Sequence, residues 1–276
     1  MIVIRKRKSK FVKLFDKTPP GVICPHFYEL VLSNGCPYNC SYCYLKLTFR
    51  GDTQPKIFTN DWCEIEKELE SIECGVMNTG ELADSLAIPP ASLPDAMRYF
   101  AKQNDKFLLL TTKSDNVSFF DDYDPTPQVI ISFSINCEMA SSRFESGAPS
   151  PKDRLKAAKE LKQRGWRIRF RLDPVIDEVG LKHYREICKE LAELNPERVT
   201  VGTLRQFPGV MNFSKNAPSK GLVKSWDGRM RYPPDHRIDI YSQIASWLER
   251  RPALCKETEQ VWTKLGWEFQ GCNCTI

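Results

Sequence analysis

The chain has 276 residues and a mass of 31.8 kDa, with 41% hydrophobic and 27% charged residues, as in an ordinary soluble globular protein. This length suffices for one large α/β domain and is short for two. No apolar run is long enough to span a bilayer, which excludes an integral membrane protein and predicts no membrane partner.

The net charge is only +5, but the charge is unevenly distributed. The stretch from Arg5 to Lys13 carries six positive residues and no acid, and residues 205–237 carry seven bases against two acids. Two basic regions on a nearly balanced chain favour a polyanionic partner, the alternative being a solvated terminal arm and a polar loop.

Eleven cysteines occur in a chain without a signal-peptide apolar region at its N-terminus. Their odd number and irregular spacing are not those of a disulfide framework. We therefore expect a reducing compartment, the cytoplasm, where thiols are free to ligate metals.

Runs rich in apolar and β-branched residues alternate with amphipathic stretches along the chain. Strands are expected near residues 27–33, 74–79, 106–112, 129–134, 166–172 and 198–203. Helices are expected over 61–73, from Ser92 or Pro94 to about 104, from Pro151 to Gly165, over about 181–194 and near 238–250. This alternation predicts right-handed βαβ units in an α/β fold, a partial (β/α)6 TIM-type barrel with its site at the C-terminal ends of the strands.

The composition suggests three parts: a basic N-terminal arm over 1–20, the barrel over 21–204 and a C-terminal extension over 205–276. In the extension, Asp227-Gly228 between two short runs predicts a hairpin. A helix and a tail that contains cysteines follow it.

The most informative motif is a C-x3-C-x2-C run formed by Cys36, Cys40 and Cys43, directly after the first expected strand. Three thiolates on one loop can hold three irons of a [4Fe–4S] cluster and leave the fourth iron open to a small molecule. The alternatives are a structural zinc site or scattered core cysteines, but zinc usually takes four ligands, and no second C-x2-C pair lies nearby.

This arrangement resembles the signature of the radical S-adenosylmethionine (SAM) enzymes, and Tyr42 before the third cysteine also fits that family. The resemblance implies two cofactors, a [4Fe–4S] cluster and SAM. It also implies the radical SAM type of partial barrel.

The ends of the second and third strands carry further candidates for SAM binding. Gly80-Glu81 resembles the family's glycine-rich strand end, whose backbone pairs with the methionine amino group of SAM, although such a pair is more usually a turn. Gly80 permits a close backbone approach, and Glu81 and Asp84, with Ser85 beside them, offer acceptors for an ammonium. Lys113 at the third strand end can pair with the SAM carboxylate; otherwise it is a solvated loop lysine.

At the end of the fourth strand, Ser134 and Asn136 lie two residues apart and hence on the same side. Both suit hydrogen bonds to a ribose or an adenine edge. Arg169 and Arg171 on the fifth strand face either the barrel interior or the solvent, a choice that the sequence leaves open.

Over residues 28 to about 245 the chain resembles spore photoproduct lyase-like proteins, the group known as DNA repair photolyase-type. The resemblance rests on the order of several motifs. These are Cys-x3-Cys-x2-Cys-Tyr, Ala83-Asp84-Ser85-Leu86-Ala87-Ile88, Thr112-Lys113, Phe133-Ser134-Ile135-Asn136, and Glu145-Ser146-Gly147-Ala148-Pro149-Ser150 with Arg154.

In that family, the cluster and SAM generate a 5′-deoxyadenosyl radical that abstracts hydrogen from a thymine dimer in DNA. The resemblance implies that Lys113 and Ser134 contact SAM and that Tyr42 or Tyr44 takes part in a radical relay. It also implies that a hairpin enters the DNA beside the lesion. The nucleic-acid contacts would then come from Lys224, Arg229, Arg231 and Tyr232.

One departure from the family concerns the cysteine that returns a hydrogen atom to the product radical, because Glu81 occupies that position here. Glutamate is a poor hydrogen-atom donor because its O–H bond is much stronger than a thiol S–H bond. Cys137, just after the fourth strand, is the best-placed substitute by sequence. The other candidates are Cys74, Cys272 and Cys274.

The C-terminal Cys272 and Cys274, with Cys255, suggest a second metal centre or a redox pair. No fourth ligand is evident, so a flexible tail with free thiols is the favoured interpretation.

The leading hypothesis is a radical SAM enzyme that acts on a nucleobase in DNA, in repair by C–C bond cleavage or in modification, with a reducing partner such as flavodoxin or ferredoxin. One alternative keeps the chemistry and changes the substrate to a peptide or a small metabolite. Another is a nucleic-acid-binding protein whose cluster is structural or redox-sensing. The sequence does not name the base or lesion, the hydrogen donor, or whether SAM is regenerated.

Overall fold

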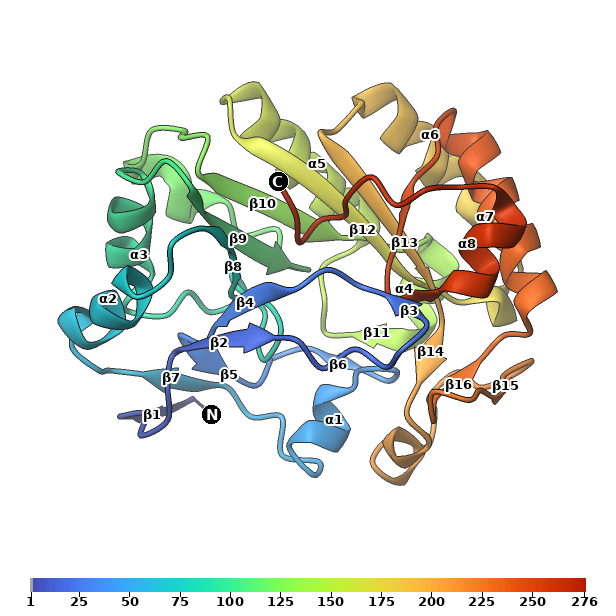
Figure 1. Ribbon diagram of the computed structural model, residues 1–276, viewed down its shortest axis with the longest axis horizontal. Coiled ribbons are helices and arrows are strands. Elements are labelled where there is room, and N and C mark those ends of the chain that lie inside the picture. The colour runs from blue at the N-terminus through green and yellow to red at the C-terminus, as the bar shows by residue number, and fades with distance from the viewer. Residues whose placement is uncertain (1) are drawn as a thin grey trace.

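The computed structural model describes residues 2–276, and its centre is an eight-stranded curled sheet in the order β17-β13-β12-β10-β9-β8-β4-β2 (Figure 1). All neighbouring strands are parallel except β2, which runs antiparallel to β4. The strands are β2 (Val12–Phe15), β4 (Phe27–Leu30), β8 (Gly75–Asn78), β9 (Lys106–Thr112), β10 (Val129–Ser134), β12 (Arg167–Val175), β13 (Arg198–Thr203) and β17 (Ala253–Leu254).

The middle of the sheet is apolar on both faces because helices cover one face and the barrel interior lies on the other. All six residues of β10 are buried, and so are Leu108, Leu109 and Leu110 of β9. Such continuous apolar runs are typical of parallel strands covered on both sides.

Helices α2 (Trp62–Glu70) and α3 (Leu93–Phe100) lie at one end of the sheet in Figure 1, α7 (Pro234–Leu248) and α8 (Glu259–Leu265) at the other, and α5 (Pro151–Gln163) and α6 (Arg185–Leu194) between them. At the start of α5, Ser150 Oγ accepts a hydrogen bond from Asp153 N at 3.2 Å, and Pro151 occupies the first turn, where its missing N–H costs nothing. Within residues 2–276, none of the helices has both the length and the apolar character needed to cross a membrane.

The predicted partial barrel is confirmed, and all six predicted strands belong to the sheet. Helix α4 (Glu138–Phe144) was not predicted, because Ser141, Ser142 and Arg143 interrupt its apolar pattern. Short elements complete this part of the chain. They are β3 (Val22–Ile23), β5 (Ser33–Asn34), β6 (Asn39–Cys40), α1 (Leu45–Thr48), β7 (Lys56–Phe58), β11 (Glu145–Ser146) and the 3-10 turns Ser118–Asp122, Asp177–Val179, Leu181–Tyr184 and Pro208–Asn212.

The basic N-terminal segment does not extend freely as the predicted arm would. Its first strand, β1 (Val3–Arg5), pairs with β7, and β2 forms the edge of the main sheet. Phe11 is buried in the core, and its N–H donates to Glu68 Oε2 at 2.8 Å. The predicted boundary at residue 20 would therefore divide β2 from the sheet of which it is the edge strand.

The C-terminal extension contains the predicted hairpin. Strand β15 (Val223–Lys224) pairs antiparallel with β16 (Met230–Arg231), which also pairs with β14 (Arg205–Gln206). Gly228 has a φ of +77° in the turn between β15 and β16, a conformation that glycine adopts without strain. The extension also returns to the barrel, because β17 joins the main sheet and β18 (Glu257–Thr258) pairs with β3.

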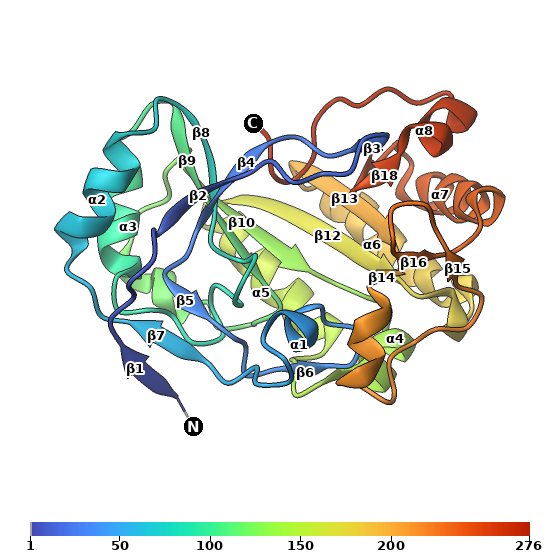
Figure 2. The same cartoon turned by 60° about the horizontal axis from the view of Figure 1, so that its bottom comes forward.

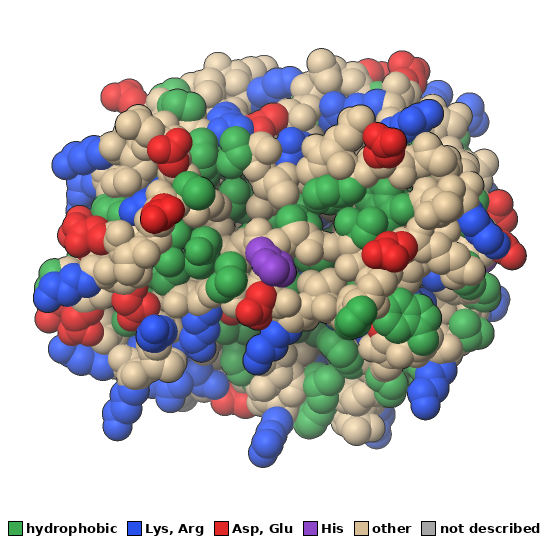
Figure 3. All heavy atoms as spheres, viewed as in Figure 1, with side chains coloured by type: hydrophobic (Ala, Val, Ile, Leu, Met, Phe, Trp, Pro, Cys, Tyr) green, Lys and Arg blue, Asp and Glu red, His purple; other side chains and the backbone are tan. Residues whose placement is uncertain are grey.

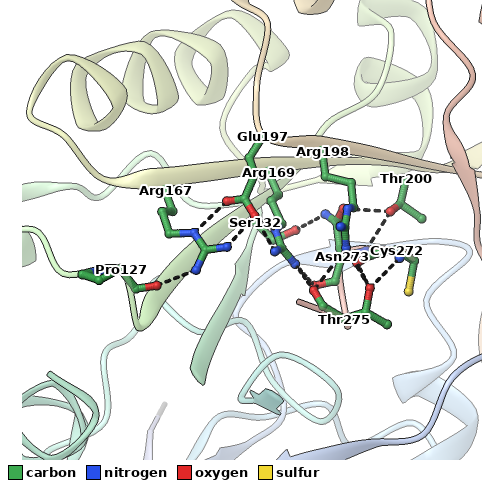
Figure 4. Close-up of polar contacts among 10 residues, drawn as sticks. All are labelled: Pro127, Ser132, Arg167, Arg169, Glu197, Arg198, Thr200, Cys272, Asn273 and Thr275. Atoms are coloured by element: carbon green, nitrogen blue, oxygen red, sulfur yellow. Dashed lines mark hydrogen bonds and ion pairs between the residues drawn. The ribbon is translucent and has the colours of Figure 1, made fainter. Parts of the chain in front are cut away.

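The expectation of a flexible C-terminal tail is wrong. Asn273 is fully buried, and its side chain donates to Ser132 Oγ at 2.7 Å and accepts from Thr200 Oγ1 at 2.7 Å (Figure 4). Arg169, also fully buried, donates to the carbonyl oxygen of Asn273 at 2.9 Å and to that of Thr275. These contacts hold the tail in place, because leaving a buried polar group without a partner costs much more free energy than leaving an exposed one without a partner.

We predict that Asn273→Ala lowers the free energy of unfolding by about 1–3 kcal/mol, because it removes hydrogen bonds to buried groups on three strands. Urea denaturation measures the change. Asn216→Ala is the control, since Asn216 is exposed, and it should alter stability little. Equal stabilities for the two variants would contradict an ordered tail.

Candidate active site

The C-terminal ends of the parallel strands surround a cavity of about 440 Å³ that extends into the barrel interior. The cysteine motif includes β6 and ends just before α1, and in Figure 2 these two elements lie below the middle strands β10 and β12. Hydrophobic side chains gather around a hollow in the face shown in Figure 3, and charged side chains lie mainly towards its edge. The volume is in the range of small-molecule and cofactor sites.

Cys36, Cys40 and Cys43 all line this cavity. Burial raises the pKa of each thiol, that of Cys40 to about 12, so the thiols stay protonated until a metal displaces the protons. No three thiol, imidazole or carboxylate groups of residues 2–276 converge closely enough to bind one metal ion. This disfavours mononuclear zinc, whereas a [4Fe–4S] cluster takes each thiolate on a different iron, and the motif fits it.

Lys113 follows β9 and lines the same cavity. Its backbone N–H donates to Asp84 Oδ2 at 2.6 Å, and Thr112 Oγ1 donates to Asp84 Oδ1 at 2.6 Å. Burial alone would lower the pKa of Lys113, but the negative charge of Glu145 outweighs it, and the pKa is raised. Lys113 is therefore a fixed cation beside the cysteine motif, and Asp84 positions it.

Glu145 is a buried carboxylate whose charge acts on Lys113. It forms an ion pair with Arg154 at 2.6 Å in which both side chains are almost fully buried, and it accepts a hydrogen bond from Tyr42 Oη. Burial alone would raise the pKa of Glu145, but Lys113 and Arg154 outweigh it and lower the pKa. This network holds Tyr42 in place, and the Lys113 ammonium lies 5.7 Å from the centre of its ring.

Gly80 lines the cavity where the chain leaves β8. A Cβ at this position would lie 2.4 Å from Thr111 Cβ, so no larger residue fits without a shift of the backbone. Next to it, Tyr44 Oη donates to the carbonyl oxygen of Glu81, and Asn78 Nδ2 donates to Glu81 Oε1 at 3.0 Å.

The structure brings most of the predicted site residues together around this cavity. Those lining it are Cys36, Cys40, Tyr42, Cys43, Tyr44, Gly80, Glu81, Asp84, Lys113 and Ser134. Two predicted cofactor contacts do not reach it. Ser85 is buried and hydrogen-bonds Thr79 Oγ1 at 2.6 Å, and Asn136 is buried and donates to the carbonyl oxygen of Pro174 at 3.1 Å. The hydrogen bonds of both side chains hold strand ends in position.

The prediction that Cys137 lies at the site is also wrong. It precedes α4 and lies in the hydrophobic core, where Tyr184 is its polar neighbour, and it does not line the cavity. Cys74 is exposed and is likewise absent from the cavity wall. Proximity in sequence to a strand end was therefore insufficient, because the helix start turns the thiol away from the interior.

The hairpin residues predicted to contact nucleic acid differ in exposure. Lys224 is exposed, and Arg229 lines the cavity with its guanidinium 5.1 Å from the centre of the Phe207 ring. Arg231 and Tyr232 are only 1% and 2% exposed, which contradicts their predicted role as surface contacts. Arg231 is neutralised by Asp227 at 2.6 Å, and Tyr232 Oη accepts from Asp177 N at 2.9 Å.

A second charged group in the cavity wall was not predicted from the sequence. Arg205 donates two hydrogen bonds to Asp173, at 2.9 and 2.8 Å, and Arg171 lies beside them. Burial alone would raise the pKa of Asp173, but Arg205 lowers it to about 2. Arg169 and Arg171 are two residues apart on β12 and both face the interior, Arg171 at the cavity wall and Arg169 fully buried against the C-terminal tail.

A parallel half-barrel with three cysteines on the loop after its first central strand is the architecture of the radical SAM superfamily. The spore photoproduct lyase family model matches residues 13–207. The chain belongs to the spore photoproduct lyase family.

Curated relatives support this assignment. The spore photoproduct lyase of Geobacillus sp. (strain Y412MC61) is 25% identical over 186 residues, which are 64% of this chain and 53% of that protein. The enzyme of the same name from Clostridium acetobutylicum is 27% identical over 176 residues, or 60% of this chain and 52% of that protein. The chain thus spans about half the length of the curated relatives that it matches.

Solved structures share the fold. A mutant spore photoproduct lyase with bound AdoMet and dinucleoside spore photoproduct superposes with a TM-score of 0.75 at 20% identity, covering 93% of this chain and 82% of that one. Streptococcus suis SuiB bound to its precursor peptide SuiA gives 0.57 at 14% identity, with 84% and 49% covered. At such identities the likeness concerns the fold alone.

We predict a pH-dependent contribution of Asp173 to stability. Its pKa is about 2 in the fold against an ordinary 3.8, so it stabilises the fold by about 2 kcal/mol above roughly pH 4 and loses this as the pH falls towards 2. In urea denaturation, Asp173→Asn should be less stable than the unmodified chain at pH 7, and this difference in stability should narrow as the pH falls from 4 to 2. A gap independent of pH would contradict the ion pair with Arg205.

Proposed function

We propose that this protein is a radical SAM enzyme that acts on a nucleobase in DNA, with a spore-type thymine lesion as the first substrate to test. The observation that carries the proposal is that the three motif cysteines, Gly80 and Lys113 line one cavity. Family membership supports it, as do family structures described as holding AdoMet and dinucleoside spore photoproduct.

In this proposal, Cys36, Cys40 and Cys43 hold a [4Fe–4S] cluster, and Gly80, Glu81, Lys113 and Ser134 surround SAM. When bound and reduced, the two cofactors together supply a 5′-deoxyadenosyl radical that takes a hydrogen atom from the substrate. The chain binds and orients the cofactors and the substrate, and it excludes water from the site. The fixed ammonium of Lys113 suits the methionine carboxylate, and the backbone of Gly80 at the cavity wall suits the amino group.

The Glu145 network keeps these groups in position before the reaction. With Arg154 fully buried behind it, Glu145 fixes Tyr42 and balances the charge of Lys113. A pre-arranged site of this kind loses less entropy when the cofactor binds. Tyr42 and Tyr44 both remain at the cavity as candidates for a radical relay.

Glu81 stands in the cavity where the lyase carries its hydrogen-donating cysteine. Cys137 lies in the core and does not replace that thiol. A repair reaction here requires another donor, and of the other thiols that the sequence suggested, Cys272 and Cys274 line the cavity. A modification that leaves the base changed does not return the same hydrogen atom. We therefore include nucleobase modification in the proposal and let the products decide.

For DNA binding, the surface beside the cavity offers an aromatic side chain that the sequence analysis passed over. Trp226 at the tip of the hairpin is 62% exposed, with Lys224 next to it and Phe207 exposed at the cavity. Exposed aromatic rings beside basic residues bind unstacked bases by stacking and phosphates by charge. We propose that Trp226, rather than Tyr232, contacts the nucleic acid.

The deciding experiment measures 5′-deoxyadenosine formed by the anaerobically reconstituted protein with SAM, dithionite as electron source, and no DNA, undamaged DNA or DNA with spore-type lesions. We expect DNA to stimulate SAM cleavage. Recovery of thymine from the lesions identifies repair, and a changed base in undamaged DNA identifies modification. SAM cleavage indifferent to DNA would contradict the nucleic-acid substrate, and no cleavage would contradict the enzyme. A protein donor such as flavodoxin or ferredoxin can then replace dithionite.

We predict that Lys113→Ala weakens SAM binding on the order of 10- to 100-fold, the effect of losing one charge-assisted hydrogen bond, while the iron content stays unchanged. Equilibrium dialysis with labelled SAM measures the affinity. Lys102→Ala removes an equal charge from an exposed site and should bind SAM normally. Unchanged affinity in Lys113→Ala would remove this residue from the SAM site.

We predict that Trp226→Ala weakens binding of lesion-containing DNA by about tenfold or more, because one stacked base contributes about 1–3 kcal/mol. Trp226→Phe keeps an aromatic face and should retain most of the affinity. Fluorescence anisotropy at fixed salt measures both variants. Equal loss in the two variants would show that stacking is not the contact.

A further inference from the structure

A second group of cysteines lies in the cavity wall, separate from the motif cysteines. Cys24, Cys255, Cys272 and Cys274 all line the cavity. They come from three segments distant in sequence: the connection from β3 to β4, the residue after β17, and the C-terminal tail. The sequence suggested three of these thiols and lacked a fourth, which the fold supplies as Cys24.

The surroundings of this thiol group are cationic. Arg171 Nη2 lies 2.7 Å from the sulfur of Cys274, and Arg205 Nη2 lies 3.1 Å from the sulfur of Cys255. Lys256 lines the same wall. Guanidinium groups directed at sulfurs stabilise the net negative charge that four thiolates bring to a metal centre.

One donor in this wall is buried without a partner. Arg171 Nε has no hydrogen-bond partner among residues 2–276, although Arg171 belongs to the cavity wall. A buried guanidinium N–H without an acceptor is costly, and it marks a place where an acceptor is missing. Sulfides of a cluster are acceptors of this kind, and such hydrogen bonds tune its potential.

Hydrogen bonds to three strands of the sheet hold the segment that contains Cys272 and Cys274. The carbonyl oxygen of Cys272 accepts a hydrogen bond from Arg198, and that of Asn273 accepts one from Arg169 (Figure 4). The Asn273 side chain donates to Ser132. Because Asn273 is directed into the strands by these contacts, the two flanking thiols have fixed positions in the wall.

We propose that Cys24, Cys255, Cys272 and Cys274 ligate a second iron–sulfur cluster. Soft thiolate ligands select iron–sulfur clusters, zinc or copper(I). A single zinc ion needs ligands that converge on one point, and no such convergence is present within residues 2–276. A cluster distributes its four thiolates over several irons, and each thiol gives up its proton on ligation. This site does not depend on the proposed DNA chemistry.

The test counts iron, acid-labile sulfide and zinc in anaerobically reconstituted variants. The triple variant Cys36→Ala/Cys40→Ala/Cys43→Ala removes the motif and should retain about two or about four irons per chain, the cluster sizes that four thiolates hold. Adding Cys272→Ala/Cys274→Ala to it should remove the remaining iron. Adding Cys188→Ala instead, a core thiol outside the cavity, should leave the iron in place.

An iron-free triple variant that retains its circular dichroism would overturn the proposal, and so would zinc bound in place of iron and sulfide. Should the tail variant fail to fold, Cys24→Ala in the triple background decides, because Cys24 lies outside the hydrogen-bond network of the tail. Iron retained in that variant would overturn ligation by all four residues. The count is independent of SAM cleavage, so it distinguishes failure of this site from failure of the proposed function.

Discussion

The parallel arrangement of the central strands is the constraint on which the rest of the structure depends. Because β4, β8, β9, β10, β12, β13 and β17 all run the same way, their carboxyl ends meet around one cavity. The cysteine motif, the Gly80 strand end and Lys113 are far apart in sequence and lie together only for this reason. The β/α units therefore determine where the site lies, and the residues that follow the strands supply its functional groups.

Charge balance within the barrel is the second requirement. Two ion pairs, Glu145 with Arg154 and Asp173 with Arg205, lie in or next to the cavity wall, and each is hydrogen-bonded as well as paired. Buried pairs of this kind contribute little net stability, but losing one partner is costly, commonly 3–5 kcal/mol when the remaining charge is buried. They hold the charged groups of the cavity wall at fixed positions.

Much of the fold could be predicted because its signals are local. Short runs rich in apolar residues at 106–112 and 129–134 are typical of buried strands, and Pro151 with Gly165 limits one helix. The motif cysteines and Lys113 were predictable because position after a strand determines position at the cavity. Cys137 shows the limit, since the start of α4 turns its side chain into the core.

Other features depend on contacts between distant segments and had no local signal. The ordered tail rests on Arg169 and Ser132, more than a hundred residues from Asn273, so the sequence read as a flexible end. Arg231 is basic and follows a hairpin turn, yet it is buried and paired with Asp227, and the exposed ring is that of Trp226. Cys24 was passed over because nothing near it in sequence suggests a ligand set.

The most direct test of this account is a crystal structure of the anaerobically reconstituted protein with SAM. The account predicts a [4Fe–4S] cluster on Cys36, Cys40 and Cys43, with SAM in the cavity and its carboxylate within hydrogen-bond distance of Lys113. SAM bound outside the cavity, or a cluster that one of these three cysteines does not ligate, would contradict the account.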